Sequence, residues 1–451
     1  MTLRERINEV LDSEYALMFY TLLAFMFYEL NISELTFFMF GLLVFYTCFF
    51  RDDLTPLYVI PLFVLISTSN GFVASTFSYV VFAISGALAL PALIYFFMKQ
   101  FAVNKKKLKL GKLFWPLVAV VGLSFVAGWG SDIYQPDQAW KFQILAIAIL
   151  AFYEVFLNFT KPNAQNYVIG CFIAFCFLAI FQMVAQVLLT EDFMGLIESK
   201  GFQIGNGNMI NQTALIFSIT IPLTLSLALE SDKPWLWVFV AVCIGFALIA
   251  TGSRANMMFG AIAGIAGFIY LLIKLKKNKA FMAFGYTCIA AAIVFAVLGV
   301  TLLKDSLFAW VFDRGFSSSG RVNLYNIALE MFAKYPILGT GLFAAEPALG
   351  FNTCMYMYHS LFFQTLACGG MVGLAVVVYY YIGKFQIMCK NFTSFKYFGL
   401  LAVLAFEAYA MVDMVGLVAS MVLVGLMPLI IMELEPQEQH KNLLKGELTN
   451  V

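Results

Sequence analysis

The stretch NYVIGCFIAFCFLAIFQMVAQVLL, residues 166–189, contains no charged side chain. A helix of this length crosses the roughly 30 Å hydrocarbon core of a bilayer. Apolar runs of mostly about 16 to 25 residues recur along the chain and are separated by short polar breaks. A membrane β-barrel would instead show strands of about ten residues with alternating hydrophobicity. The sequence therefore predicts an all-α, polytopic membrane helical bundle.

Composition supports a membrane protein. The chain is 62% hydrophobic and 12% charged, with a mean hydropathy of +0.88, whereas soluble domains are about 45–50% apolar. The net charge of +1 gives no field that would favour a nucleic-acid partner. The eight cysteines have no C-x-x-C spacing, so the pattern indicates neither a metal site nor a disulfide framework. We expect the lipid bilayer as a partner and predict no metal and no cofactor.

Hydropathy divides the chain into about fourteen spans. They are expected at residues 16–30, 34–50, 54–69, 74–98, 113–128, 138–158, 166–189, 210–229, 235–250, 254–273, 280–303, 358–383, 396–412 and 414–432. The first run lacks a small-residue cleavage pattern, so we expect a retained span rather than a signal peptide. If the N-terminus is cytoplasmic, most of the 27 lysines and arginines fall on cytoplasmic segments, as the positive-inside rule requires.

This topology predicts four regions. Transmembrane helices occupy 1–303, an outward-facing loop 304–357, further transmembrane helices 358–432, and a cytoplasmic tail 433–451. Within the loop, residues 322–335 have the pattern of an amphipathic helix lying on the membrane surface. Its expected apolar face comprises Val322, Tyr325, Leu329 and Phe332. Pro336 and a Gly-Thr-Gly turn at 339–341 are expected to end the helix.

The same topology brings three basic residues to the outer face. Arg254 is expected to open a helix in the sequence TGSR, with Ser253 or Thr251 as N-cap. Arg321 starts the loop helix, and His359 falls in the first turn of the next span. A helix N-terminus beside a guanidinium suits phosphate, and the same dipole disfavours imidazolium. The site therefore has the chemistry to bind an anion and accept a proton.

Each of these residues also has a simpler interpretation. Arg254 could extend its side chain to lipid headgroups, as basic residues near span ends commonly do. Arg321 could be a solvated loop residue, and His359 an interfacial polar residue. His440, the second histidine of the chain, is expected in the tail without a role. The functional interpretation depends on the three basic residues occurring together.

Three motifs resemble the O-antigen ligase family of membrane glycosyltransferases, which includes lipopolysaccharide O-antigen ligases and Wzy polymerases. TGSRANMMFG at 251–260 is similar to the family's S-R-x-x-x-x-G segment. RVNLYNIALEMFAKYPILGTG at 321–341 resembles its arginine before a P-x-x-G-x-G turn, and HSLFFQTLACGGMVGL at 359–374 its histidine before an apolar run ending in glycines. The similarity extends over about 200 residues. Ser360 departs from the asparagine common after the histidine, and twelve spans are usual, so we expect about 12–14.

The resemblance implies an enzyme of the bacterial cytoplasmic (inner) membrane, with both termini cytoplasmic and its active site on the outer face. Such enzymes transfer a glycan from undecaprenyl diphosphate to an acceptor hydroxyl without a metal, in lipopolysaccharide or other polysaccharide biosynthesis. Arg254 and Arg321 would hold the diphosphate, and His359 would be the general base. Asp413 would orient the imidazole or the acceptor. Weaker candidates for sugar or phosphate contacts are Asn208, Asn211 and Gln212.

Two alternatives stay open at this stage. The acceptor is lipid A-core in a ligase and a second lipid-linked glycan in a polymerase, and the sequence does not separate these. A lipid-linked glycan flippase or secondary transporter would also have many spans. Transporters place ionisable residues near the bilayer midplane and show internal repeats, whereas here the basic residues are at one face and no repeat is visible. Glu154 and Glu407 are the main carboxylates within expected spans.

Overall fold

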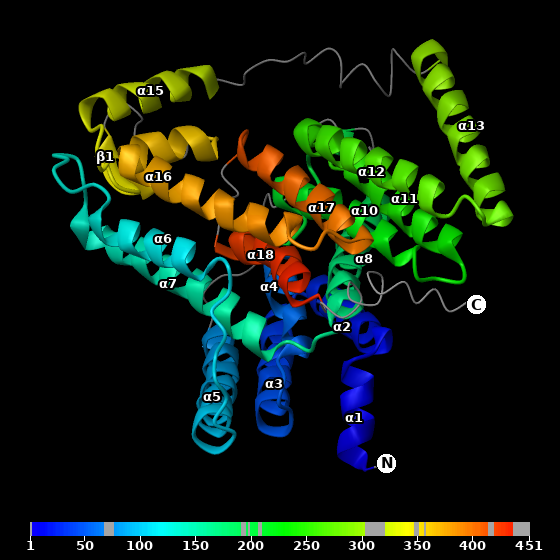
Figure 1. The fold of residues 1–451 in the computed structure, drawn as a ribbon, viewed down its shortest axis with the longest axis horizontal. Coiled ribbons are helices and arrows are strands. Elements are labelled where there is room, and N and C mark those ends of the chain that lie inside the picture. The colour runs from blue at the N-terminus through cyan, green and yellow to red at the C-terminus, as the bar shows by residue number, and fades with distance from the viewer. Residues whose placement is uncertain are drawn as a thin grey trace.

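The computed structural model describes residues 2–66, 76–190, 195–196, 199–205, 210–302, 321–346, 351–355, 358–413 and 419–435. Helices dominate these ranges (Figure 1). In the first half of the chain they are α1 (Leu3–Leu11), α2 (Glu14–Glu29), α3 (Glu34–Phe50), the 3₁₀ helix η1 (Thr55–Tyr58), α4 (Val59–Ile66), α5 (Thr76–Met98), the π-helix η2 (Lys99–Val103), α6 (Phe114–Val126), α7 (Pro136–Phe159) and α8 (Gln165–Leu189).

The second half continues with α10 (Ile210–Leu227), α11 (Pro234–Ala250), α12 (Arg254–Lys274), α13 (Lys279–Leu302), α15 (Arg321–Lys334), α16 (Leu361–Cys389), α17 (Ser394–Ala410) and α18 (Ala419–Leu434). Each of the expected spans coincides with one of the helices. The all-α prediction is confirmed, with one local addition: β1 (Phe343–Glu346) and β2 (Phe351–Met355) form a small antiparallel sheet after α15.

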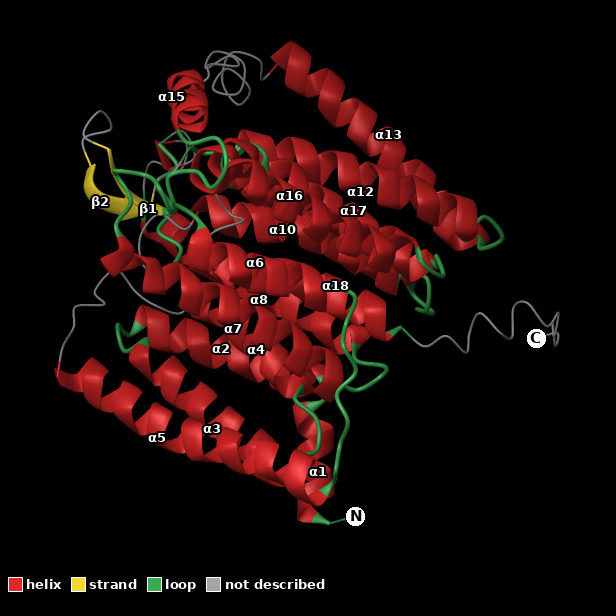
Figure 2. Cartoon of the chain, turned by 60° about the vertical axis from the view of Figure 1, so that its left-hand side comes forward, coloured by secondary structure: helices red, strands yellow, loops and turns green. Residues whose placement is uncertain are grey.

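The long helices run side by side in a polytopic bundle (Figure 2). Within the described residues, six helices are long and apolar enough to cross a membrane, and five shorter helices of 10–17 residues are also apolar. α1 and α2 together would form a further span with a bend of 70°. α15 and the β1–β2 sheet lie at one end of the bundle, and α1 lies at the other.

α10 forms the centre of the bundle, in contact with α8, α11, α12 and α17. Nearly all of its residues are buried, which explains why it is apolar around its whole circumference. Two of its hydroxyls are bonded within the helix: those of Ser218 and Thr220 donate to the carbonyl oxygens of Ala214 and Ile216. The core therefore accommodates hydroxyls without leaving these donors unpaired.

A break in α16 receives the turn that follows α15. Gly370 has φ 60° and ψ −153°, outside helical values. The backbone N–H groups of Met371 and Val372 donate to the carbonyls of Pro336 and Ile337, and those of Thr340 and Gly341 donate to Ala367 and Cys368. The turn thus pairs backbone groups that the break leaves without helical partners. This docking fixes α15 against the end of α16.

α15 packs against the bundle through residues other than most of its expected apolar face. Val322 and Leu329 are 54% and 46% exposed, while Leu324, Ile327 and Met331 pack against the buried cluster around Ala328. Of the predicted face, Tyr325 does contact α16, where its ring stacks on Phe363 with centroids 4.2 Å apart. Val322 and Leu329 thus stay available to a membrane surface, and the expectation that α15 lies on that surface stays a prediction.

Candidate functional site

His359 and Asp413 meet at the end of the bundle that carries α15. His359 lies just before α16, whose N-cap is Ser360, so it is not in the first helical turn as expected. Its φ of 49° is in the left-handed region, uncommon outside glycine but tolerated by histidine. The Nδ1 atom lies 3.1 Å from Oδ1 of Asp413, which follows α17. The imidazole is 40% exposed and the carboxylate 17%, so the histidine remains accessible.

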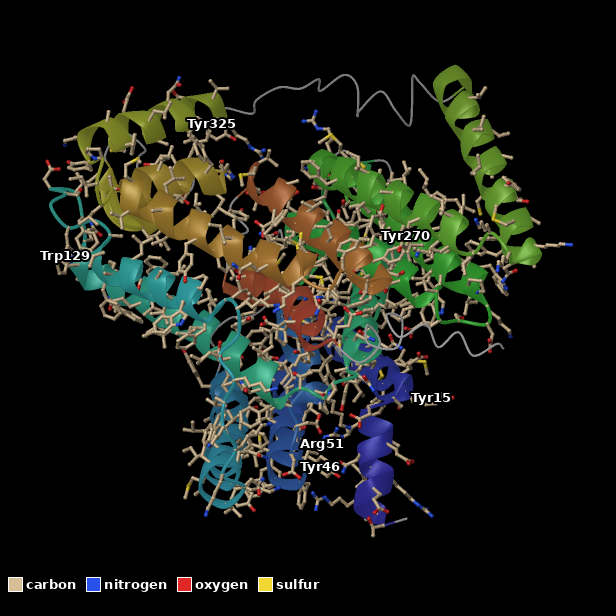
Figure 3. All side chains as sticks on the ribbon, in the orientation of Figure 1. Tyr15, Tyr46, Arg51, Trp129, Tyr270 and Tyr325 are labelled. Atoms are coloured by element: carbon tan, nitrogen blue, oxygen red, sulfur yellow. The ribbon has the colours of Figure 1, made fainter. Side chains whose placement is uncertain are left out.

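Tyr409 and Tyr325 support this pair from two sides. The Tyr409 hydroxyl donates to Oδ2 of Asp413 at 2.7 Å, so both carboxylate oxygens have partners. The Tyr325 hydroxyl, on the side of α15 that faces α16 (Figure 3), donates to the carbonyl oxygen of His359 at 3.4 Å. A histidine whose Nδ1 and main chain are both held has a defined ring orientation.

Each of the two arginines is the first residue of a helix, as the sequence predicted. Arg321 is the first residue of α15, and its charge acts on the hydroxyl of Tyr409. Arg254 is the first residue of α12, with Ser253 as N-cap. The Ser253 hydroxyl does not cap the helix through its side chain; it accepts a hydrogen bond from the amide of Asn256 instead. Arg321 thus approaches the His359–Asp413 pair through Tyr409.

Asn256 links the start of α12 to the start of α10. Its side chain is fully buried and donates to the backbone oxygen of Asn211 at 3.1 Å, and it also lies beside the Tyr409 hydroxyl. Among the described residues, Oδ1 of Asn256 and Oε1 of Gln212 are buried without a hydrogen-bond partner. Buried acceptors of this kind favour a donor such as a hydroxyl.

The remaining amide candidates have different placements. Oδ1 of Asn211 lies 3.5 Å from the ammonium of Lys200, which precedes α10 in the chain. Asn208 lies outside the described residues, as does His440. Among the predicted site residues that the structure describes, His359, Asp413 and Arg321 are linked to Tyr409, and Asn211 is linked to Asn256. Gln212 follows Asn211 in α10, and Arg254 precedes Asn256 by two residues in α12.

Sequence reasoning missed Tyr409 and Asn256, which join these two sets of residues. Tyr409 stands four residues before Asp413, a spacing that places both side chains on one face of a helix. Asn256 stands two residues after Arg254, in the first turn of α12. A role for Tyr409 could have been predicted from its spacing to Asp413, and a role for Asn256 from its proximity to Arg254 in the sequence. The contacts of Asn256 with Asn211 and with Tyr409 do not follow from spacing, because they join helices that are distant in the chain.

The geometry fits proton acceptance at the second ring nitrogen of His359. Nδ1–H donates to the Asp413 carboxylate, which leaves Nε2 with the free lone pair. The carboxylate would also stabilise the imidazolium that forms when Nε2 takes a proton. Arg321 and the helix start at Arg254 supply positive charge at the same end of the bundle.

Residues 239–378 match the family model described as O-antigen ligase. This segment, about a third of the chain, is therefore similar to the O-antigen ligase family. The matched O-antigen ligase segment contains Arg254, Arg321 and His359, while Asp413, Asn211 and Gln212 lie outside it. No curated protein gives a significant match to the chain.

Proposed function

We propose that this protein is a membrane glycosyltransferase that transfers a glycan from undecaprenyl diphosphate to an acceptor hydroxyl, as an O-antigen ligase of lipopolysaccharide biosynthesis. The observation that carries the proposal is the half-exposed His359, whose Nδ1 contacts Asp413 beside the charge of Arg321. The family match supplies the substrate class, lipid-linked glycans in a membrane. His359, Asp413 and Arg321 supply the acid–base and electrostatic groups that transfer of such a glycan requires.

In the proposed reaction His359 is the general base. Nε2 takes the proton of the acceptor hydroxyl as its oxygen attacks the anomeric carbon. The bond from that carbon to the diphosphate oxygen breaks, and the diphosphate leaves with the electron pair. Attack opposite the leaving group inverts the anomeric centre. Asp413 and Tyr409 are positioning residues, since they act on the reacting atoms through the imidazole.

Arg321 and Arg254 hold the diphosphate in this proposal. Charge develops on the leaving oxygens, and guanidinium groups beside helix N-termini stabilise it with charge-assisted hydrogen bonds. The buried amides of Gln212 and Asn256 offer acceptors to sugar hydroxyls at the starts of α10 and α12. In this proposal, the residues at Tyr409 and the residues at Asn256 contribute to one site. The proposed mechanism needs no metal.

The proposed setting is the bacterial inner membrane with the site at its outer face. Residues 1–303 and 358–432 form the membrane region, 304–357 the outer loop, and 433–451 a cytoplasmic tail. The structure supports this division because the candidate site lies with α15 and the β1–β2 sheet, at the end of the bundle opposite α1. Excess basic residues on the segments near α1 would then face the cytoplasm.

Transfer in proteoliposomes tests the proposal. The donor is an undecaprenyl-diphosphate oligosaccharide, and the acceptor is lipid A-core in one series and a second donor molecule in another. We expect product on lipid A-core with the wild type. His359→Ala should lower the rate about 10²–10⁴-fold, and Arg321→Ala should abolish donor turnover. The exposed Lys277→Ala, at the opposite end of the bundle, is the matched control.

Each outcome assigns a different function. A ladder of lengthened lipid-linked chains would identify a Wzy-type polymerase of O-antigen, capsule or exopolysaccharide. Full activity in His359→Ala would remove the general-base assignment. Movement of the intact donor across the bilayer without transfer would identify a flippase.

A further inference from the structure

A cleft between α2, α8, α10 and α11 lies apart from the candidate site. Its volume is about 710 Å³, within the 300–1,000 Å³ typical of ligand pockets. It follows α8 from Asn166 to Phe181, a rise of about 22 Å along the helix. Its wall is apolar and includes Leu17, Leu22, Ile173, Ala174, Phe177, Trp237 and Val240. The cleft is long enough and apolar enough for a hydrocarbon chain.

The mouth of the cleft is acidic. Glu14 opens α2, and Glu230 and Ser231 follow α10, so these polar groups gather at one end together with Asn166. Both carboxylates are exposed. No lysine, arginine or histidine is among the residues that line the cleft. The wall and the mouth together fit an amphiphile with an apolar tail and a cationic head.

The position of Glu14 is fixed by the bend between α1 and α2. The guanidinium of Arg51, at the end of α3 (Figure 3), contacts Asp12 at 2.7 Å and Asp53 at 2.9 Å, and it is only 3% exposed. Lys161 also pairs with Asp12. These cations are bonded to aspartates that do not line the cleft, so they leave its mouth acidic.

The donor lipid of the candidate site does not fit this cleft. Arg321 begins α15, which lies at one end of the bundle, whereas Glu14 follows α1, which lies at the other end (Figure 2). Two carboxylates would repel a diphosphate, and they would equally repel an anionic phospholipid. A primary ammonium, in contrast, can donate hydrogen bonds to both. A quaternary ammonium has no N–H to donate.

We propose that the cleft is a binding site for a phospholipid with a primary ammonium headgroup, of the phosphatidylethanolamine type. One acyl chain lies along α8 between α2 and α11. The ammonium contacts Glu14 and Glu230, and the Ser231 hydroxyl and Asn166 amide donate to phosphate or glycerol oxygens. The site belongs to the leaflet at the α1 end and takes no part in glycan transfer.

Native mass spectrometry of the full chain tests this site by the lipid it retains. The protein is released from bilayers that contain equal fractions of phosphatidylethanolamine, phosphatidylcholine and phosphatidylglycerol. We expect the wild type to retain phosphatidylethanolamine with a preference of about tenfold over phosphatidylcholine. Glu14→Gln with Glu230→Gln should reduce that preference to about twofold or less. Glu29→Gln, at the exposed far end of α2, should leave it unchanged.

A second variant tests the wall of the cleft. Ala174→Phe places a ring in the apolar channel and should reduce the retention of every phospholipid. Equal retention of the three lipids by the wild type would overturn the proposal, as would a preference that survives the double glutamate substitution. A dimer that Ala174→Phe dissociates would show that a second copy of the chain occupies the cleft. These readouts do not depend on glycan transfer, so they stand apart from the proposed function.

Discussion

Two acid–base pairs connect the region of α16 with the region of α17. The surroundings of the two pairs differ. His359 and Asp413 meet at the end of the two helices, where the imidazole is 40% exposed. Lys384 and Glu407 pair within the bundle, with side chains 8% and 13% exposed. The Tyr381 hydroxyl donates to the second Glu407 oxygen at 2.7 Å, and the Lys384 ammonium lies 4.2 Å from the ring centre of Tyr380.

The difference separates a pair that substrate can reach from one whose charges are satisfied inside the protein. Lys384 and Glu407 line a mostly apolar cavity of about 140 Å³. Glu154, the other carboxylate expected within a span, accepts a hydrogen bond from the backbone of Gly111. Ionisable residues in spans often mark transport pathways, but these contacts fit helix packing. The comparison therefore favours the enzyme over a transporter.

Breaking the buried pair should have the largest effect. Lys384→Met leaves the Glu407 charge without its partner and should lower the free energy of unfolding by about 3–5 kcal/mol. Thermal unfolding in detergent measures the loss. Adding Glu407→Leu should recover most of it, because an apolar pair of similar size replaces the ion pair. If the single variant abolished transfer while its stability was unchanged, the structural role would be wrong.

Neutralising the carboxylate of the His359–Asp413 pair should affect the rate of glycan transfer rather than the stability of the protein. Asp413→Asn keeps the shape but removes the charge that orients His359 and stabilises its protonated form. A hydrogen bond to a charged group contributes about 1.5–3 kcal/mol, so transfer should slow by roughly 10- to 100-fold. The rate at saturating donor, measured in proteoliposomes, should fall with little change in donor KM. A change in KM alone would place Asp413 in donor binding instead.

Gly370 lies in α16 between His359 and Lys384, one member of each pair. The break in the helix at Gly370 therefore affects the relative positions of these two residues. The Gly370 φ of 60° strains any other residue, and an added Cβ would lie 2.5 Å from backbone atoms of Ile337. Gly370→Ala should therefore cost about 1–3 kcal/mol and lower activity, with thermal unfolding as the measure. Gly86→Ala, where no atom lies within 4 Å of the added Cβ, is the control. Equal stability of both variants would show that the break in α16 is not required.

Removing the Tyr409 hydroxyl should give the smallest effect. Tyr409→Phe leaves the contact between His359 and Asp413 but deletes one hydrogen bond to the carboxylate. Because that bond acts on the imidazole only through Asp413, we expect only about 1 kcal/mol of its energy to affect the transition state. Transfer should slow roughly fivefold. A loss as large as that of His359→Ala would make the hydroxyl part of the reacting group. An unchanged rate would show that Asp413 needs no second partner.

Helix positions followed from the sequence more closely than helix faces did. Long apolar segments determine where spans lie, because each must supply its own backbone hydrogen bonds in lipid. α15 is apolar at Val322, Leu324 and Leu329, so its sequence contains more than one plausible apolar face. Packing against α16 selected the face with Leu324 and exposed the other two. Periodicity cannot make that choice when several faces are apolar.

The break in α16 at Gly370 was also not predicted from the sequence. Cys368, Gly369 and Gly370 stand within an apolar run, and glycines are frequent in transmembrane helices. The break becomes favourable only because the 336–341 turn supplies hydrogen bonds to the freed backbone groups. Those bonds come from a segment about 30 residues earlier in the chain, so local propensity carries no sign of them.

The sequence by itself determined that this chain is a membrane bundle of helices, with Arg254 and His359 near the ends of expected spans and Arg321 at the start of the loop helix. Hydropathy, helix length and charge distribution act on each segment separately, so they can be assessed without knowing its neighbours. Only the tertiary structure decided that His359 meets Asp413, that Tyr409 and Asn256 connect the basic groups, and that Lys384 finds Glu407. Such contacts depend on where helices cross and break, and those positions are set by packing between segments distant in the chain.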